Sequence, residues 1–352
     1  MKIRQSLLLI FTFLAACALL IFPAEAAAGA KNGIGYCLQI LVPSLYPFMV
    51  LSVFIVKSGF SEKMGNVLEV PCRKVLKLPG SAAATILMSA IGGYPTGARG
   101  IAALYECGAL TESQAARMLC FCVNAGPAFV ISAVGAGFLK SSRAGGILFA
   151  SQLIASFFLS ILCSISAKNE TVPRKAGKRR GVGAANALVL SAADAAKAMV
   201  GMCCFVILFA AFLNLFRIWV KQPIASTVLS ALMEVTGGCS DLTKLGVPLW
   251  AFSLAIGWAG ISVHFQILSF FPNIKVHLPR FVFYRLLHGL LAALTTVLLM
   301  RVFPVDIEAF SNISKPLTPS LSGSVPASAA LIILCIALII CLPREKLEIE
   351  DI

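Results

Sequence analysis

The sequence contains few charged residues. Only 12% of its 352 residues are Asp, Glu, Lys or Arg, and three are His, whereas 59% are hydrophobic. A water-soluble fold of this length would expose more polar side chains than this chain has. Acids are the scarcer charged residues, with 15 against 29 Lys and Arg. We read the basic excess as that of cytoplasmic loops in a membrane protein, and we predict no nucleic-acid partner.

The sequence also lacks the patterns of catalytic and metal sites. It has no HExxH, no Walker loop and no set of Ser, His and an acid suited to one aqueous face. The 12 cysteines lie mostly in apolar segments, and neither Cys120-x-Cys122 nor Cys203-Cys204 has a second ligand pair at zinc spacing. We therefore predict no enzyme, no metal and no cofactor, apart from H⁺ or Na⁺ as a coupling ion.

Long apolar segments are what the sequence has in abundance. A bilayer core is crossed by roughly 20 apolar residues in a helix. Seven windows approach or exceed this length: Ser6–Phe22, Gly33–Val56, Gly145–Ala167, Ala198–Phe216, Leu249–Phe271, Phe281–Phe303 and Ala327–Leu342. We predict an all-α polytopic membrane protein with about 8 transmembrane helices and two re-entrant, broken hairpins.

The first window allows two interpretations. Lys2, Arg4 and the small-residue stretch Ala24-Glu25-Ala26 fit a secretory signal peptide, whereas the length of the apolar run fits a helix that is retained. We favour the retained helix and expect residues 1–32 to form an N-terminal signal anchor.

The basic loops predict where the first broken hairpin lies. Residues 57–77 hold five Lys or Arg and residues 168–180 hold six, so both loops should be cytoplasmic. Three apolar stretches separate them, and three full crossings would place the loops on opposite sides. One stretch must therefore enter and leave by the same face. The stretch Ala82–Leu104 is the natural choice, because Gly92-Gly93-Tyr94-Pro95-Thr96-Gly97 cannot continue as a regular helix.

A weak internal repeat suggests a second hairpin of opposite orientation. The pattern LMxxxGG occurs at residues 87–93 and again at 232–238, and Ala125-Gly126 is echoed by Ala259-Gly260. The charge bias places the second hairpin, Val228–Lys244, on the outer face, with Lys275, Arg280 and Arg285 and both chain termini on the cytoplasmic side. Inverted repeats of this kind are typical of secondary transporters. We therefore predict a first repeat at residues 33–167, a basic linker at 168–183 and an inverted second repeat at 184–303. Residues 304–352 should form an external loop, a last helix and a short C-terminal tail.

These elements resemble a known family. The stretch from Pro43-Ser44-Leu45-Tyr46-Pro47-Phe48 through Gly92-Gly93-Tyr94-Pro95-Thr96-Gly97-Ala98-Arg99 to Asn124-Ala125-Gly126-Pro127 is similar to the sporulation integral membrane protein YlbJ family, which carries a nucleoside-recognition gate domain. The resemblance implies that the protein lies in a bacterial membrane, specifically the outer forespore membrane. It also implies that the protein transports dipicolinate during spore formation.

Several residues are candidates for the solute site. The predicted hairpin tips offer backbone amides and hydroxyls, Arg99 could pair with a carboxylate, and Glu234 could couple a proton or cation. Each candidate also has a structural interpretation. The glycines could serve only helix packing, and Arg99 could extend to the membrane surface. Glu234 could pair with a structural partner, and His264 could be a core residue. The substrate-binding candidates are Gly93, Tyr94, Pro95, Thr96, Gly97, Arg99, Asn124, Gly126, Thr236, Gly237, Gly238, Ser262 and His264, with Glu234 as the coupling residue.

Three functions fit these features. The first is a carrier for a small anionic aromatic solute, dipicolinate by resemblance, which works by alternating access between inverted repeats. The second is a nucleoside transporter. The third is a membrane organiser in spore maturation that recruits partners through the basic loop Lys168–Arg180 and does not transport. The partners expected in the first two cases are a small-molecule solute and the lipid bilayer, and a homo-oligomer is left open.

Overall fold

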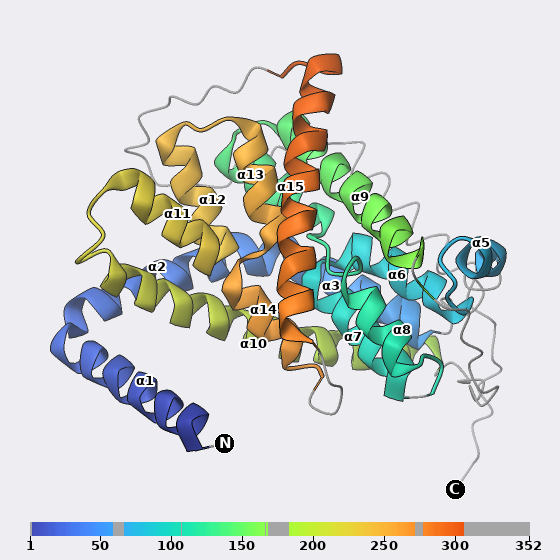
Figure 1. Cartoon of the computed structure of the whole chain (residues 1–352), viewed down its shortest axis with the longest axis horizontal. Coiled ribbons are helices and arrows are strands. Elements are labelled where there is room, and N and C mark those ends of the chain that lie inside the picture. Colours follow the sequence, from blue (N-terminus) through green and yellow to red (C-terminus); the bar gives the residue numbers. More distant parts are fainter. Residues whose placement is uncertain are drawn as a thin grey trace, which may run out of the picture. The chain divides into compact units, whose positions relative to one another are not determined.

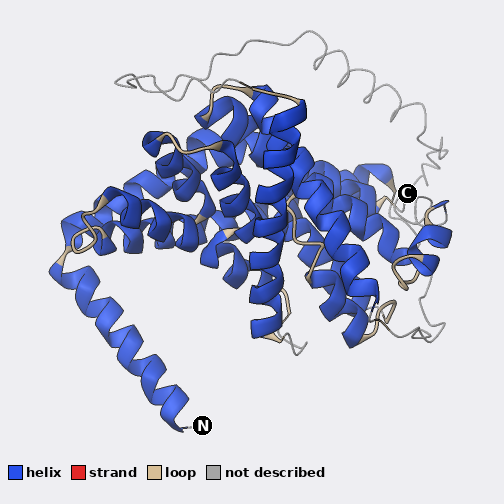
Figure 2. Ribbon diagram, turned by 45° about the horizontal axis from the view of Figure 1, so that its top comes forward, coloured by secondary structure: helices blue, strands red, loops and turns tan. Residues whose placement is uncertain are grey.

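A computed structural model describes residues 2–58, 67–106, 108–165, 167, 183–271 and 277–305. Within these ranges every regular element is a helix (Figure 2), so the predicted all-α fold is confirmed. Residues 168–182 of the predicted basic linker and the predicted last helix, Ala327–Leu342, lie outside the described residues.

Five helical segments in the described ranges are long and apolar enough to cross a membrane. They are Pro23–Ile55, Ser142–Ile165, Ala184–Phe216, Leu249–Leu268 and Leu278–Val302. Shorter apolar helices cover Thr12–Ile21, Ser81–Gly92, Ala128–Phe138 and Pro223–Met233. The chain is thus a polytopic α-helical membrane protein. Residues 118–139, an apolar stretch between the two basic loops, do not form one continuous helix.

The N-terminal region forms two helical arms. Helix α1 (Lys2–Ile21) ends at a bend, and α2 (Pro23–Tyr36) starts with proline at its first position, where a missing N–H costs nothing. Helix α2 continues through the π-helix η1 (Cys37–Leu41) into α3 (Val42–Lys57), so the chain has no break near residue 33.

Helix α2 packs along the long helix α10 (Ala184–Phe216), and glycines allow the close approach. A Cβ at Gly29 would lie 2.5 Å from the carbonyl oxygen of Ala210, and one at Gly33 would lie 2.8 Å from the Cα of Ile207. Small residues of this kind let helix backbones pack closely within a bilayer.

Both halves of the chain contain a hairpin, an interrupted element and a closing helix in the same order. In the first half, α5 (Glu69–Lys74) precedes a hairpin of α6 (Ser81–Gly92) and α7 (Tyr94–Glu106). Helix α8 (Glu112–Leu119), an irregular stretch and the π-helix η2 (Ala128–Phe138) follow, and α9 (Ser142–Ile165) closes this half.

The second half begins with α10, which leads into a hairpin of α11 (Pro223–Met233) and α12 (Val235–Leu245). An interrupted helix follows, consisting of α13 (Leu249–Trp258) and α14 (Gly260–Leu268), and α15 (Leu278–Val302) closes the half. In Figure 1 the orange α15 runs between the two hairpins. It packs on α13 of its own half and on α9 of the first half.

One sequence prediction needs correction. The second hairpin does not break at its glycine pair: the chain is extended at Glu234, and Gly237 and Gly238 lie inside α12. A capping carboxylate starts α12 at this point, so glycine is not needed for the break. Arg285 lies within the predicted span Phe281–Phe303 and is completely buried in α15, where backbone carbonyls accept its hydrogen bonds.

A cavity between two helix breaks as the candidate functional site

The first hairpin is broken by a glycine. Gly93 adopts φ 83° and ψ −176°, a backbone conformation essentially confined to glycine. Helix α7 starts at the next residue and has no acidic residue in its first turn. The positive end of the α7 dipole is therefore not neutralised by a carboxylate of that turn.

A second glycine supports this break from the neighbouring chain. A Cβ at Gly126 would lie 2.9 Å from the backbone nitrogen of Gly93 and 3.0 Å from the carbonyl oxygen of Ile91. Only a residue without a side chain fits between these backbone atoms. The irregular stretch before η2 is thus packed directly on the break in the first hairpin.

The second hairpin is broken at Glu234, whose backbone is extended and whose side chain is only 2% exposed. Its Oε1 accepts a hydrogen bond from the amide of Thr236 at 2.9 Å, and its Oε2 accepts one from the amide of Gly237 at 2.7 Å. The carboxylate therefore satisfies two free amides of α12 and opposes the positive end of its dipole.

A glycine from the following interrupted helix supports this break too. A Cβ at Gly260 would lie 3.0 Å from the nitrogen of Val235 and 3.1 Å from the carbonyl oxygen of Met233. Gly260 therefore holds the place in the second half that Gly126 holds in the first. The predicted correspondence of Ala125-Gly126 with Ala259-Gly260 agrees with these contacts, and the break at Gly93 corresponds to the break at Glu234.

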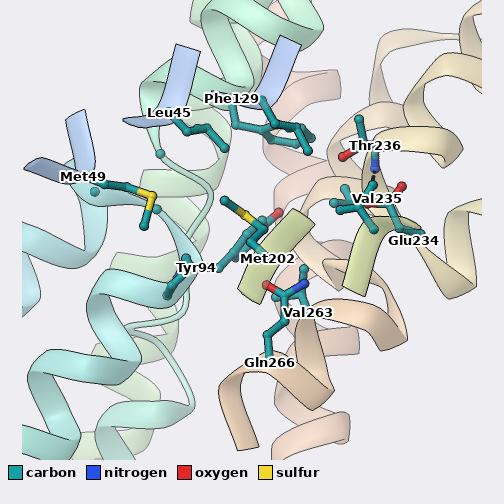
Figure 3. Close-up of a pocket in the computed structure, with 16 residues that line it drawn as sticks. Leu45, Met49, Tyr94, Phe129, Met202, Glu234, Val235, Thr236, Val263 and Gln266 are labelled. Carbon is teal, nitrogen blue, oxygen red and sulfur yellow. Dashed lines mark hydrogen bonds between the residues drawn. The ribbon is translucent and has the colours of Figure 1, made fainter. Parts of the chain in front are cut away.

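Both breaks line one cavity (Figure 3). The volume open to the centre of a water-sized molecule is about 40 Å³, so the cavity is narrow in this structure. Tyr94 and Met202 approach it from one side, and Glu234 and Thr236 lie on the other. None of the lining residues is cationic. They are Leu41, Leu45, Met49, Gly92, Gly93, Tyr94, Pro95, Gly126, Phe129, Met202, Val206, Glu234, Val235, Thr236, Val263 and Gln266.

The cavity brings together six of the residues that the sequence singled out. From the first half these are Gly93, Tyr94, Pro95 and Gly126, and from the second half Glu234 and Thr236. The Tyr94 hydroxyl also crosses between the halves, because it donates a 2.6 Å hydrogen bond to the carbonyl oxygen of Ile256. Tyr94 therefore links the first break to the helix that ends beside the second.

Four further candidates lie next to the breaks and have packing or capping contacts. The Thr96 hydroxyl donates to the carbonyl oxygen of Gly92 at 2.9 Å. A Cβ at Gly97 would lie 1.9 Å from the carbonyl oxygen of Cys122, and one at Gly238 would lie 2.5 Å from the Cα of Ala231. Gly237 donates its amide to Glu234. These positions therefore hold the hairpin arms together.

The remaining four candidates do not line the cavity. The Arg99 guanidinium lies 5.6 Å from the centre of the Phe270 ring and donates to the carbonyl oxygen of Asp194 at 3.3 Å. The Asn124 amide donates to Ser89, Phe121 and Ser156. Ser262 accepts a hydrogen bond from Gln266, and His264 packs against Trp258 and Phe281.

A buried network around Arg285 ties the closing helices to the first half. Arg285 donates to the carbonyl oxygens of Val123 and Cys120, in the irregular stretch before η2, and to Nδ1 of His288 at 2.6 Å. Nε2 of His288 lies 3.2 Å from the carbonyl oxygen of Gln152, whose own amide donates to the carbonyl oxygen of Ser253 at 2.9 Å. Gln152 and His288 therefore form the interhelical hydrogen bonds expected of polar residues in closing helices.

Sequence reasoning missed the apolar wall of the cavity. Met202 and Val206 come from α10, Leu45 and Met49 from α3, and Val263 from α14. Such residues are indistinguishable in sequence from lipid-facing or core residues. A usable signal lies in the spacing of Met202 and Val206, which places both on one face of α10.

Parts of this sequence are similar to known proteins. Residues 38–142 match the Gate family, described as nucleoside recognition, and this region includes the first hairpin and Gly126. The sporulation integral membrane protein YlbJ of Bacillus subtilis (strain 168) is 23% identical over 343 residues, covering 85% of this chain and 84% of the relative. No solved structure matches. These matches confirm the predicted resemblance: the chain is an integral membrane protein that contains a Gate domain and is similar to YlbJ along most of its length.

Proposed function

We propose that the protein carries a small heteroaromatic solute across the membrane and binds it in the cavity between Gly93 and Glu234. One observation carries this proposal: the two helix breaks, from separate halves of the chain, line the same cavity. Irregular backbone at membrane depth is tolerated where it is buried in protein or lines a solute path, and transporters with paired repeats bind their solutes at such breaks.

The cavity lining favours an uncharged ring over a dianion. Phe129 and Tyr94 offer aromatic rings, and Met49 and Met202 offer polarizable sulfur. The charged group among the lining residues is the acid Glu234. A nucleoside could stack its base on the apolar wall and donate its hydroxyl groups to this carboxylate. The two carboxylates of dipicolinate would meet no cation there, so a nucleoside is our first solute and dipicolinate our second.

Dipicolinate stays a candidate because of the first break. Helix α7 presents an N-terminus without an acidic residue in its first turn, and Gly93, Tyr94 and Pro95 place this N-terminus at the cavity. Such a helix end attracts a negative group. The name of the YlbJ relative also places that protein in sporulation.

We further propose that Glu234 couples solute movement to H⁺ or Na⁺. Binding either cation would remove the negative charge that caps α12, and would thereby change the stability of the second break. The two halves would then rock about the cavity and open it alternately to each side of the membrane. In this proposal the two hairpins have opposite orientations, and both chain termini lie in the cytoplasm of a bacterial cell.

Uptake into proteoliposomes tests the proposal. Wild-type protein should accumulate labelled uridine above empty vesicles, and Glu234→Gln should lower the rate by roughly tenfold, because it weakens a charged hydrogen-bonding group. Glu106→Gln, at an exposed acid at the end of α7, is the matched control and should transport at the wild-type rate.

The other outcomes also decide between functions. Uptake of dipicolinate but not uridine would reverse our order of solutes and leave transport standing. If folded wild-type protein moves neither solute, the transport proposal fails and the membrane organiser is favoured.

A further inference from the structure

A second hollow lies at the open end of the second hairpin, away from the cavity. It is formed by the end of α10, the turn into α11 and the end of α12, and it shares no lining residue with the cavity. Its lining residues are Arg217, Val220, Lys221, Pro223, Ser226, Thr227, Asp241, Lys244 and Leu245. Helix α12 therefore has Glu234 at its first end and this hollow near its last turn.

The hollow has an excess of positive charge. Three of its lining residues are cations, Arg217, Lys221 and Lys244, and one is an acid, Asp241. Asp241 pairs with Arg217 through Oδ2 and with Lys244 through Oδ1 at 3.0 Å, and its side chain is 11% exposed. One buried carboxylate thus holds two cations in place, and their combined charge with Lys221 exceeds its own by two.

Neighbouring groups suit a phosphate oxygen. Arg217 lines the hollow, and its side chain is 35% exposed and therefore partly open to a ligand. Ser226 and Thr227 add hydroxyl groups to the same lining. Arginine and lysine side chains that converge with hydroxyl donors are the groups that bind phosphate most readily in proteins.

The surroundings of the hollow resemble those of a membrane interface. The apolar run of α10 ends at Phe216, and Trp219 follows with 61% of its surface exposed and its ring edge-on to Phe22 at 5.6 Å. Exposed tryptophan next to basic residues is typical of the membrane interface. Ile224, also exposed, offers apolar surface beside the hollow for an acyl chain.

We propose that this hollow binds a phosphate-bearing anion, with the phosphate held by Arg217, Lys221 and Lys244. An anionic phospholipid and free phosphate share this chemistry, and binding experiments separate them. The site stands apart from the proposed transport, because its readout is binding and not flux.

The test compares lipid retention by purified full-length protein. Wild type and Lys221→Gln/Lys244→Gln are exchanged into nanodiscs with equal phosphatidylglycerol and phosphatidylcholine, and bound lipid is measured by native mass spectrometry. Each interfacial Lys contributes about 1 kcal/mol to anionic lipid binding, so the variant should retain roughly tenfold to thirtyfold less phosphatidylglycerol. Lys31→Gln/Lys74→Gln removes the same charge from exposed lysines elsewhere and should retain lipid like the wild type.

A second arm measures binding of inorganic phosphate in neutral detergent by calorimetry. If phosphatidylglycerol retention is unaffected while phosphate binding depends on Lys221 and Lys244, the site holds and its ligand is a soluble anion. If neither ligand depends on this lysine pair, or if the control pair changes binding equally, the proposal is wrong. Asp241→Asn should tighten binding where the variant folds, since it frees Arg217 and Lys244.

Discussion

The first hairpin is broken by glycine, whereas the second is broken by glutamate. At Gly93 the backbone takes a conformation that other residues avoid, and no acid in the first turn caps the helix that follows. At Glu234 the backbone is ordinarily extended, and the side chain caps the next helix. A break at membrane depth can therefore be stabilised either by backbone freedom or by a capping charge.

The difference gives the cavity two unlike ends. The end at α7 keeps a partial positive charge, and the end at α12 carries a carboxylate that balances its helix dipole. Each break is nevertheless supported in the same way, by Gly126 in one half and Gly260 in the other. The support is common to both halves, while the electrostatics are specific to each.

The largest expected effect comes from removing support at the second break. Gly260→Ala should lower the free energy of unfolding by about 3 kcal/mol, because Gly260 has φ 77° and its added Cβ would lie 3.0 Å from the nitrogen of Val235. Unfolding in mixed detergent micelles measures this. Gly201→Ala, where nothing lies within 4 Å, is the control and should be neutral or stabilising. Equal stability of the two variants would contradict the claim that Gly260 supports the second break.

Gly93→Ala should have a slightly smaller effect, a loss of about 2 kcal/mol. Here the strain lies in the backbone, since the nearest atom to the added Cβ would be the nitrogen of Gly126 at 3.4 Å, an ordinary contact. The same unfolding measurement applies. If the loss of unfolding free energy is smaller than that of an ordinary substitution within a helix, glycine is not what permits the first break.

Glu234→Gln should cost about 1 kcal/mol of stability, since the amide oxygen still accepts one hydrogen bond but the charge opposite the α12 dipole is gone. Glu106→Gln should change stability little, because that acid is exposed at the end of α7. If the Gln variant is as stable as wild type, the carboxylate does not hold the second break.

Ala259→Gly should change stability least, with a gain of up to about 1 kcal/mol. Ala259 has φ 73°, a left-handed conformation that costs alanine more than glycine. A loss of stability would mean that the Ala259 methyl group contributes packing that outweighs its strain.

Much of the fold could be predicted from sequence, because spans and breaks have local causes. The run of Gly92, Gly93 and Pro95 predicts the first break, which the structure places at Gly93. The second break was misplaced, because the prediction relied on Gly237 and Gly238. A carboxylate that accepts hydrogen bonds from amides two and three residues later leaves no strong pattern in sequence. Capping depends on a backbone geometry that the local amino-acid sequence does not determine.

The candidate site was predicted less completely. Tyr94 and Glu234 were found because a break and a buried acid stand out in apolar sequence. Arg99 was placed at the solute because it follows the break, yet its position in α7 directs its guanidinium to Phe270. Arg285 was placed on the cytoplasmic side by charge alone, and its burial, which the charge pattern does not predict, depends on contacts with a stretch 162 residues away.

Solute uptake by two tryptophan variants of α10 tests the central claim most directly. Met202 lines the cavity, and Val200 in the same helix is 62% exposed toward the surroundings. Met202→Trp should fill the space between the two breaks and reduce uridine uptake into proteoliposomes to the level of empty vesicles, while Val200→Trp should transport like the wild type. Wild-type uptake by folded Met202→Trp protein would contradict the account, because the solute would then pass elsewhere.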